Sequence, residues 1–122
     1  MKNFKELGIW KKGMDIATLS FKLVLSFPKE EKFGLSSQIT RASVSIPSNI
    51  AEGSSRHGDR EYDRFISFAL GSCFELETQL LIAEAVNYGD FDLRQSLLVI
   101  VGEERRMLLA FSKSLRFKNP RP

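Results

Sequence analysis

One segment of the chain, LSSQITRASVSIPSNIAEGSS (residues 35–55), combines an apolar stripe with a polar row at the same helical spacing. At about 100° per residue, one narrow helix face collects Leu35, Ile39, Ala42, Ile46, Ile50 and Gly53. The row directly beside it consists of Gln38, Arg41, Ser45, Asn49 and Glu52. Such polar groups are costly to bury unless they hydrogen-bond one another or a partner. The segment therefore predicts a closely packed helix that carries a polar network.

Three further segments repeat apolar residues at helical spacing, and turn residues separate them. We expect helices over about 7–27, from 35 onward, over 59–87 and over 93–115, with Asp59 and Asp92 as helix caps. Pro28 ends the first helix because proline has no amide donor. Pro47 lies inside the second helix, where the continuing apolar spacing predicts a bend and no break.

This helix pattern defines the predicted architecture. No strand pattern competes, and short connections between four helices favour an all-α, antiparallel up-down-up-down four-helix bundle. At 122 residues, a single domain over residues 1–122 is expected, with a flexible basic tail over about 116–122. The third helix is apolar on more than one side, which is typical of a central helix or of an oligomer interface.

The residue inventory argues against an enzyme. The chain has one histidine, His57, in a polar turn, and one cysteine, Cys73, in an apolar helix pattern. These predict no metal site, no catalytic residues and no cofactor, and a buried Cys73. The N-terminal segment lacks the apolar core of a secretory signal, and no run approaches the ~20 apolar residues of a membrane span. We expect a cytoplasmic protein with no membrane partner.

The charge is unevenly distributed along the chain. Residues 105–122 contain six Lys or Arg and no Asp or Glu, whereas residues 59–104 are strongly acidic. In an up-down bundle, the start of the first helix and the end of the fourth lie at the same end. We therefore predict a phosphate-binding surface there. Its predicted residues are Lys11, Lys12, Arg105, Arg106, Lys113, Arg116 and Lys118.

The polar row of the second helix has two interpretations. It holds a ligand, or it forms a structural network at a helix contact or interface, in which Arg41 pairs with Glu75 or Glu52. We favour the structural network because paired buried charges more often serve specificity than catalysis. Its predicted members are Gln38, Arg41, Ser45, Asn49, Glu52 and Glu75.

The segments FPKEEKFGLSSQITRASVSIPSNIAEGSSR and EYDRFISFALGSCFELETQL closely resemble those of a known family. These are the 23S ribosomal RNA intervening-sequence proteins, which are small bacterial four-helix-bundle proteins. The resemblance implies a left-handed antiparallel bundle and a ring-shaped homopentamer. It also implies a relation to the accessory variability proteins of diversity-generating retroelements, which bind nucleic acid and a reverse transcriptase through a basic pentameric surface.

Together, these features predict a non-enzymatic homo-oligomer that binds structured RNA or DNA weakly through the basic end of the bundle. Repetition of the basic surface in the oligomer would strengthen a weak contact. The alternative is a structural or interaction module whose partner is a protein, which the acidic third helix and the broad apolar faces favour.

Overall fold

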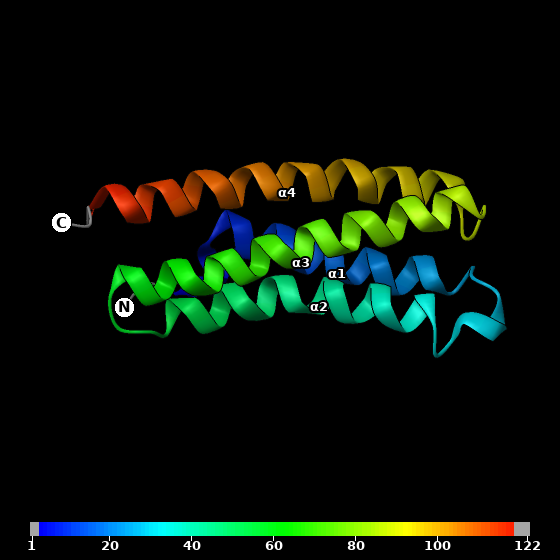
Figure 1. Ribbon diagram of the computed structural model, residues 1–122, viewed down its shortest axis with the longest axis horizontal. Helices are drawn as coiled ribbons and strands as arrows, with labels where there is room; N and C mark the ends of the chain where they lie inside the picture. Colours follow the sequence, from blue (N-terminus) through cyan, green and yellow to red (C-terminus); the bar gives the residue numbers. More distant parts are fainter. Residues whose placement is uncertain (1–2, 119–122) are drawn as a thin grey trace.

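A computed structural model describes residues 3–118 of the chain (Figure 1). Two short 3₁₀ helices accompany the four long helices. The elements in order are η1 (Phe4–Glu6), α1 (Gly8–Val24), η2 (Lys29–Glu31), α2 (Leu35–Ser54), α3 (Asp59–Ala85) and α4 (Phe91–Lys118). The described residues contain no strand.

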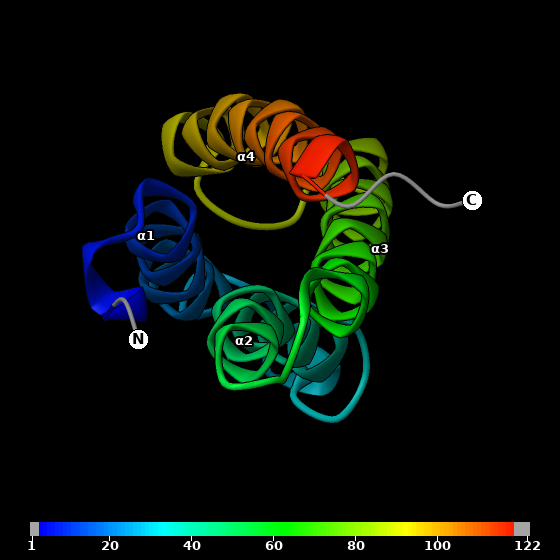
Figure 2. The same cartoon turned by 90° about the vertical axis from the view of Figure 1, so that its left-hand side faces the viewer.

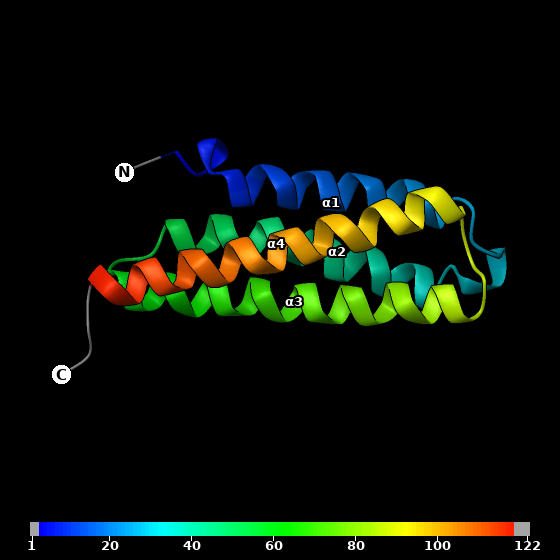
Figure 3. The same cartoon turned by 90° about the horizontal axis from the view of Figure 1, so that it is seen from above.

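The four long helices form the predicted antiparallel bundle. Each helix packs against the next one in the chain, and α4 closes the arrangement by packing against α1. Figure 2 shows the four helices around one common axis. The predicted all-α four-helix fold is confirmed, and the start of α1 and the end of α4 lie at the same end (Figure 3).

The core of the bundle is a continuous line of aliphatic side chains from all four helices. Burial of each such side chain stabilises the fold by ~1.5–3 kcal/mol. The predicted apolar stripe of α2 faces this core. The largest fully buried aliphatic residues are Ile16, Leu23, Ile39, Ile46, Ile50, Ile66, Leu76, Leu80, Leu97, Val101 and Leu108.

Close packing of α2 on α3 depends on Gly53. A Cβ atom there would lie 2.9 Å from Cβ of Phe65 and 3.0 Å from the ring of Tyr62, so a larger residue would push the helices apart. The α helix also continues through Pro47, which confirms that the proline does not break it.

The ends of α1 and α4 differ most from the prediction. Helix α1 ends at Val24, whereas we expected Phe27. Helix α4 continues through Lys118, so residues 116–118 are not part of a flexible tail. The reason is that Leu115 is buried and the Arg116 side chain is bound to α3. Residues 119–122 of the predicted tail lie outside the described residues.

The helix caps also differ. Asp90, and not Asp92, caps α4, since its Oδ2 accepts a hydrogen bond of 2.9 Å from the Leu93 amide. Asp59 is the first residue of α3, and Gly58 precedes it with φ of 83°. Glycine reaches this left-handed backbone conformation without strain, which explains why Gly58 and not an aspartate occupies the cap position.

Helix α3 is long and apolar enough to cross a membrane by length and composition. A helix of a protein core passes the same test. In the bundle, α3 packs against both α2 and α4, and Glu75, Glu77 and Gln79 lie in its middle. We therefore interpret α3 as a helix of the bundle whose outer face is unusually apolar.

Candidate functional surfaces

One end of the bundle collects basic side chains from three elements. The α2–α3 turn and the end of α4 lie at the same end of the bundle (Figure 1). The turn and the start of α3 contribute Arg56, Arg60 and Arg64, and the last turns of α4 contribute Lys113 and Arg116. All five are exposed, and three of them also form ion pairs: Arg56 with Glu52, Arg64 with Glu61, and Arg116 with Asp63. We call these five residues the basic end. Its α4 members were predicted from the sequence, and its α3 members were not.

The position of Arg116 is set by a buried carboxylate. Arg116 Nε donates a hydrogen bond of 2.9 Å to Oδ2 of Asp63, and Ser112 Oγ donates one of 2.5 Å to Oδ1. The Asp63 side chain is only 8% exposed, whereas that of Arg116 is 64% exposed. Asp63 thus holds Arg116 in place through the Nε atom, and much of the arginine side chain stays accessible to a ligand.

Phenylalanine rings lie beside the arginines of the basic end. The Arg56 guanidinium stands 4.8 Å from the ring centre of Phe65, and that of Arg64 stands 5.3 Å from the ring centre of Phe68. The two rings meet edge to face with centres 5.5 Å apart. Proteins that bind single-stranded nucleic acids use aromatic rings to stack on the bases and neighbouring arginines to contact the phosphates.

The sequence argument missed Arg60 and Arg64 of α3 for a simple reason. They belong to residues 59–104, where ten acidic residues outweigh the basic ones. A sum of charges over residues 59–104 combines the arginines at the start of α3 with the acidic residues that follow them. The sum therefore hides the basic start of the helix. Only the spacing of Arg56, Arg60 and Arg64 by four residues could have indicated a common location.

Among the six predicted basic residues whose side chains the structure describes, Lys12 and Arg105 form ion pairs and lie apart from Lys113 and Arg116. Lys12 Nζ forms an ion pair of 2.9 Å with Glu103. Glu103 precedes Arg116 by 13 positions, which is about 20 Å along a helix. Arg105 turns to the α3 side, where Nε lies 3.3 Å from Glu77 Oε1 and the guanidinium lies 5.4 Å from the ring centre of Phe74.

The separation has a physical cause. Helix α4 has 28 residues and α1 has 17, so α4 extends well past the start of α1. Lys11 and Arg106 are exposed near the level of Lys12.

The Lys12 ammonium also lowers the pKa of Glu103 through its hydrogen bond and its charge. The side chain of Lys118 lies outside the described part of the chain.

The predicted polar row of α2 divides into separate parts. Asn49 Nδ2 donates to Ser45 Oγ at 2.9 Å, and Ser72 Oγ of α3 donates to the same oxygen at 2.9 Å. This part is a true link between helices, to which Ser72 is an unpredicted addition. Glu52 instead forms an ion pair of 3.2 Å with Arg56.

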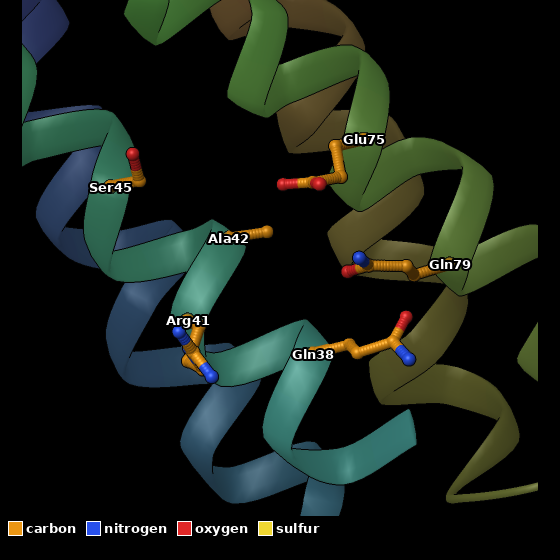
Figure 4. A pocket seen from close by; sticks show the side chains of 6 residues that line it. All are labelled: Gln38, Arg41, Ala42, Ser45, Glu75 and Gln79. Atoms are coloured by element: carbon orange, nitrogen blue, oxygen red, sulfur yellow. The ribbon is translucent and has the colours of Figure 1, made fainter. Parts of the chain in front are cut away.

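The expected ion pair of Arg41 is absent. Within residues 3–118, Arg41 pairs with neither Glu75 nor Glu52, and both Arg41 and Glu75 are exposed. Their helices hold them on opposite walls of an open groove between α2 and α3, whose volume is about 330 Å³. Figure 4 shows its lining: Gln38, Arg41, Ala42, Ser45, Glu75 and Gln79. We call this feature the polar groove.

A buried carboxyl group in the core was not predicted. Glu104 is fully buried, and neither of its carboxylate oxygens has a hydrogen-bond partner among the described residues. A Cβ atom added to Gly13 would lie 3.2 Å from its Oε2, so the glycine makes room for the carboxyl group. Burial raises the pKa of Glu104 to about 8, although the Lys12 charge opposes the shift.

Burial also determines the reactivity of the Cys73 thiol. Cys73 is a free, buried thiol, as predicted, and burial raises its pKa to about 12. A thiol that stays protonated is a poor nucleophile. The described residues contain no group of three or more His, Cys, Asp or Glu side chains that could hold a metal ion. The surfaces described above present charges, hydrogen-bonding groups and aromatic faces.

The fold and these surfaces define an antiparallel four-helix bundle with a basic end and a polar groove. The chain belongs to the 23S rRNA-intervening sequence protein family, whose model matches residues 5–110. A solved structure from Bacteroides thetaiotaomicron, described as a protein with unknown function from the S23 ribosomal protein family, has the same fold. It is 21% identical, with a TM-score of 0.77, and the match covers 86% of this chain and 98% of that one. No curated protein matches the chain.

Proposed function

We propose that the protein is a non-enzymatic homo-oligomer that binds structured RNA or DNA through the basic end of the bundle. The observation that carries this proposal is the convergence of Arg56, Arg60, Arg64, Lys113 and Arg116 at one end, with phenylalanine rings beside them. Phosphates bind to such clusters of exposed cations, and exposed rings stack on bases. The family name refers to ribosomal RNA intervening sequences, which supports a nucleic-acid ligand. We also propose that the protein acts in the cytoplasm.

Self-association is the second part of the proposal. The outer face of α3 exposes an unusual number of large apolar side chains, and Phe74, for example, is 51% exposed. By helical spacing, these side chains fall within less than half of the circumference of α3, and grouped exposed apolar residues are typical of interaction sites. The sequence resemblance specifies a ring-shaped homopentamer and a relation to the retroelement accessory variability proteins. The exposed apolar residues of α3 are Phe68, Phe74, Leu81, Ile82 and Val86.

An anisotropy titration with labelled structured RNA and duplex DNA at several salt concentrations tests the ligand. The test variant replaces Arg60, Arg64 and Lys113 with alanine, and the matched control replaces Lys22, Lys29 and Lys32 near the opposite end. Each lost phosphate contact reduces the slope of log K against log salt by ~0.7–0.9. We therefore expect a slope smaller by about two in the test variant and no change in the control.

Arg116 stays intact in this design because its removal would leave Asp63 unpaired and disturb the fold. Equal binding by the two triple variants would refute the basic end as the contact surface. Binding without salt dependence would refute phosphate recognition altogether.

The alternative is a module that binds a protein, and the apolar outer face of α3 favours it. Its test uses Phe74→Ser, which changes that face without touching the basic end. A protein that co-purifies in fixed stoichiometry with the wild type and is lost with Phe74→Ser, in the absence of nucleic acid, would establish the alternative. Sedimentation velocity of the same variant reports whether the face serves self-association.

A further inference from the structure

The polar groove contains one cationic and one anionic side chain that do not form an ion pair with each other. Arg41 projects from α2 and Glu75 from α3, and neither forms an ion pair within the described part of the chain. A protein that needed only to join α2 to α3 at this point would pair these charges across the gap. Their separation leaves a cation and an anion available to one bound molecule.

An unsatisfied buried acceptor lies in the same groove. The Gln79 side chain is only 7% exposed, and its Oε1 has no hydrogen-bond partner among residues 3–118. Figure 4 shows Glu75 and Gln79 pointing from α3 toward α2. A buried acceptor without a donor is costly, so the groove is more stable when a donor enters it.

The second wall offers donors. The Ser45 hydroxyl oxygen already accepts from Asn49 and Ser72, so its own proton is free to be donated. Arg41 lies one helical turn before Ser45 on α2 and lines the same groove, and its guanidinium carries several N–H groups suited to a carboxylate. The groove thus has an acceptor wall on α3 and a donor wall on α2.

The size and lining restrict the ligand. A volume of about 330 Å³ lies at the small end of the ~300–1,000 Å³ of typical ligand sites. Ala42 is the single apolar residue in the lining, and no ring is present that could stack on a nucleobase. A compact, polar molecule with both charges fits these features, whereas a base or an apolar ligand does not.

We infer that the polar groove binds the zwitterion of a small or polar free α-amino acid. Its ammonium group donates to Glu75 and to Oε1 of Gln79. Its carboxylate accepts from Arg41 and Ser45. This site is remote from the basic end and does not depend on nucleic-acid binding.

Isothermal titration calorimetry of the full chain with glycine, serine, asparagine and glutamine tests the inference. Glycinamide, which lacks the carboxylate, and acetate, which lacks the ammonium, are the ligand controls. We expect at least one amino acid to bind while neither control does. Glu75→Gln, Arg41→Gln and Gln79→Leu should each weaken binding by about tenfold to a hundredfold, the usual effect of losing a hydrogen bond to a charged group.

Glu30→Gln and Lys22→Gln are the matched protein controls, because they remove one negative and one positive charge at exposed positions outside both the groove and the basic end. Unchanged affinity in these two variants supports the inference. Absence of heat with every amino acid at about 10 mM would overturn it, as would equal binding of glycinamide. A change in sedimentation mass on Glu75→Gln, without amino-acid binding by the wild type, would assign the groove to a subunit contact and also overturn it.

Discussion

Replacement of Glu104 by glutamine should remove most of the pH dependence of the folding stability between pH 4.5 and pH 8. Glu104 is fully buried without a hydrogen-bond partner for either oxygen in the described residues. Its pKa is about 8 in the folded protein, against 4.5 for the ordinary side chain. Glutamine has nearly the same shape and cannot ionise, so the substitution removes the titration of Glu104 and keeps its packing.

The sign of the effect follows from proton linkage. Between pH 4.5 and pH 8, the folded protein keeps the Glu104 proton and the unfolded chain releases it. The free energy of unfolding therefore falls as pH rises through this window. Each unit of pKa difference corresponds to ~1.4 kcal/mol, so the wild type loses at most about 5 kcal/mol that Glu104→Gln retains.

Urea denaturation followed by circular dichroism at pH 4.5, 6 and 8 measures this difference. Glu103→Gln is the matched control, because Glu103 is an adjacent carboxyl group whose pKa is lowered by Lys12 and is not raised. The control should follow the wild type across the window. If the stabilities of the wild type and Glu104→Gln stay parallel from pH 4.5 to pH 8, the buried position of Glu104 is incorrect.

Three further substitutions test the packing. Gly53→Ala should cost about 1–3 kcal/mol in urea denaturation, because its Cβ would meet Cβ of Phe65 at 2.9 Å; an unchanged midpoint would mean that α2 and α3 are not closely packed there. Asp63→Ala should cost about 1–3 kcal/mol and speed amide exchange at the end of α4, since it frees Arg116; unchanged exchange would contradict that anchoring. Leu76→Ala should cost about 2–5 kcal/mol and lower the thermal midpoint, and a loss below 1 kcal/mol would place Leu76 outside the core.

The helices were predictable because their causes are local. The apolar spacing sets each helix, and the turns depend on Pro28, Gly58 and Gly89. Each of these signals lies within a few positions of the helix or turn that it determines. Even so, the two caps were placed at Asp59 and Asp92, one and two positions from Gly58 and Asp90. Several nearby residues can satisfy a helix end, and tertiary contacts decide which one does.

The candidate surfaces were predictable only in part. Lys113 and Arg116 followed from the basic C-terminal run, but Arg60 and Arg64 of α3 were hidden within an acidic stretch. The ion pair of Lys12 with Glu103 depends on the relative lengths of α1 and α4. Helix length sets the level at which side chains of different helices meet, and sequence spacing within one helix does not contain that information.

By itself, the sequence determined the helical composition, the apolar stripe of α2 and the close resemblance to one family, because periodicity and ordered motifs are properties of the chain alone. The tertiary structure decided which polar groups found partners. It joined Ser45 to Ser72 and left Arg41 and Glu75 unpaired, and it buried Glu104 opposite Gly13. The physical reason is that burial and pairing depend on distances between helices, which arise only when the core has packed.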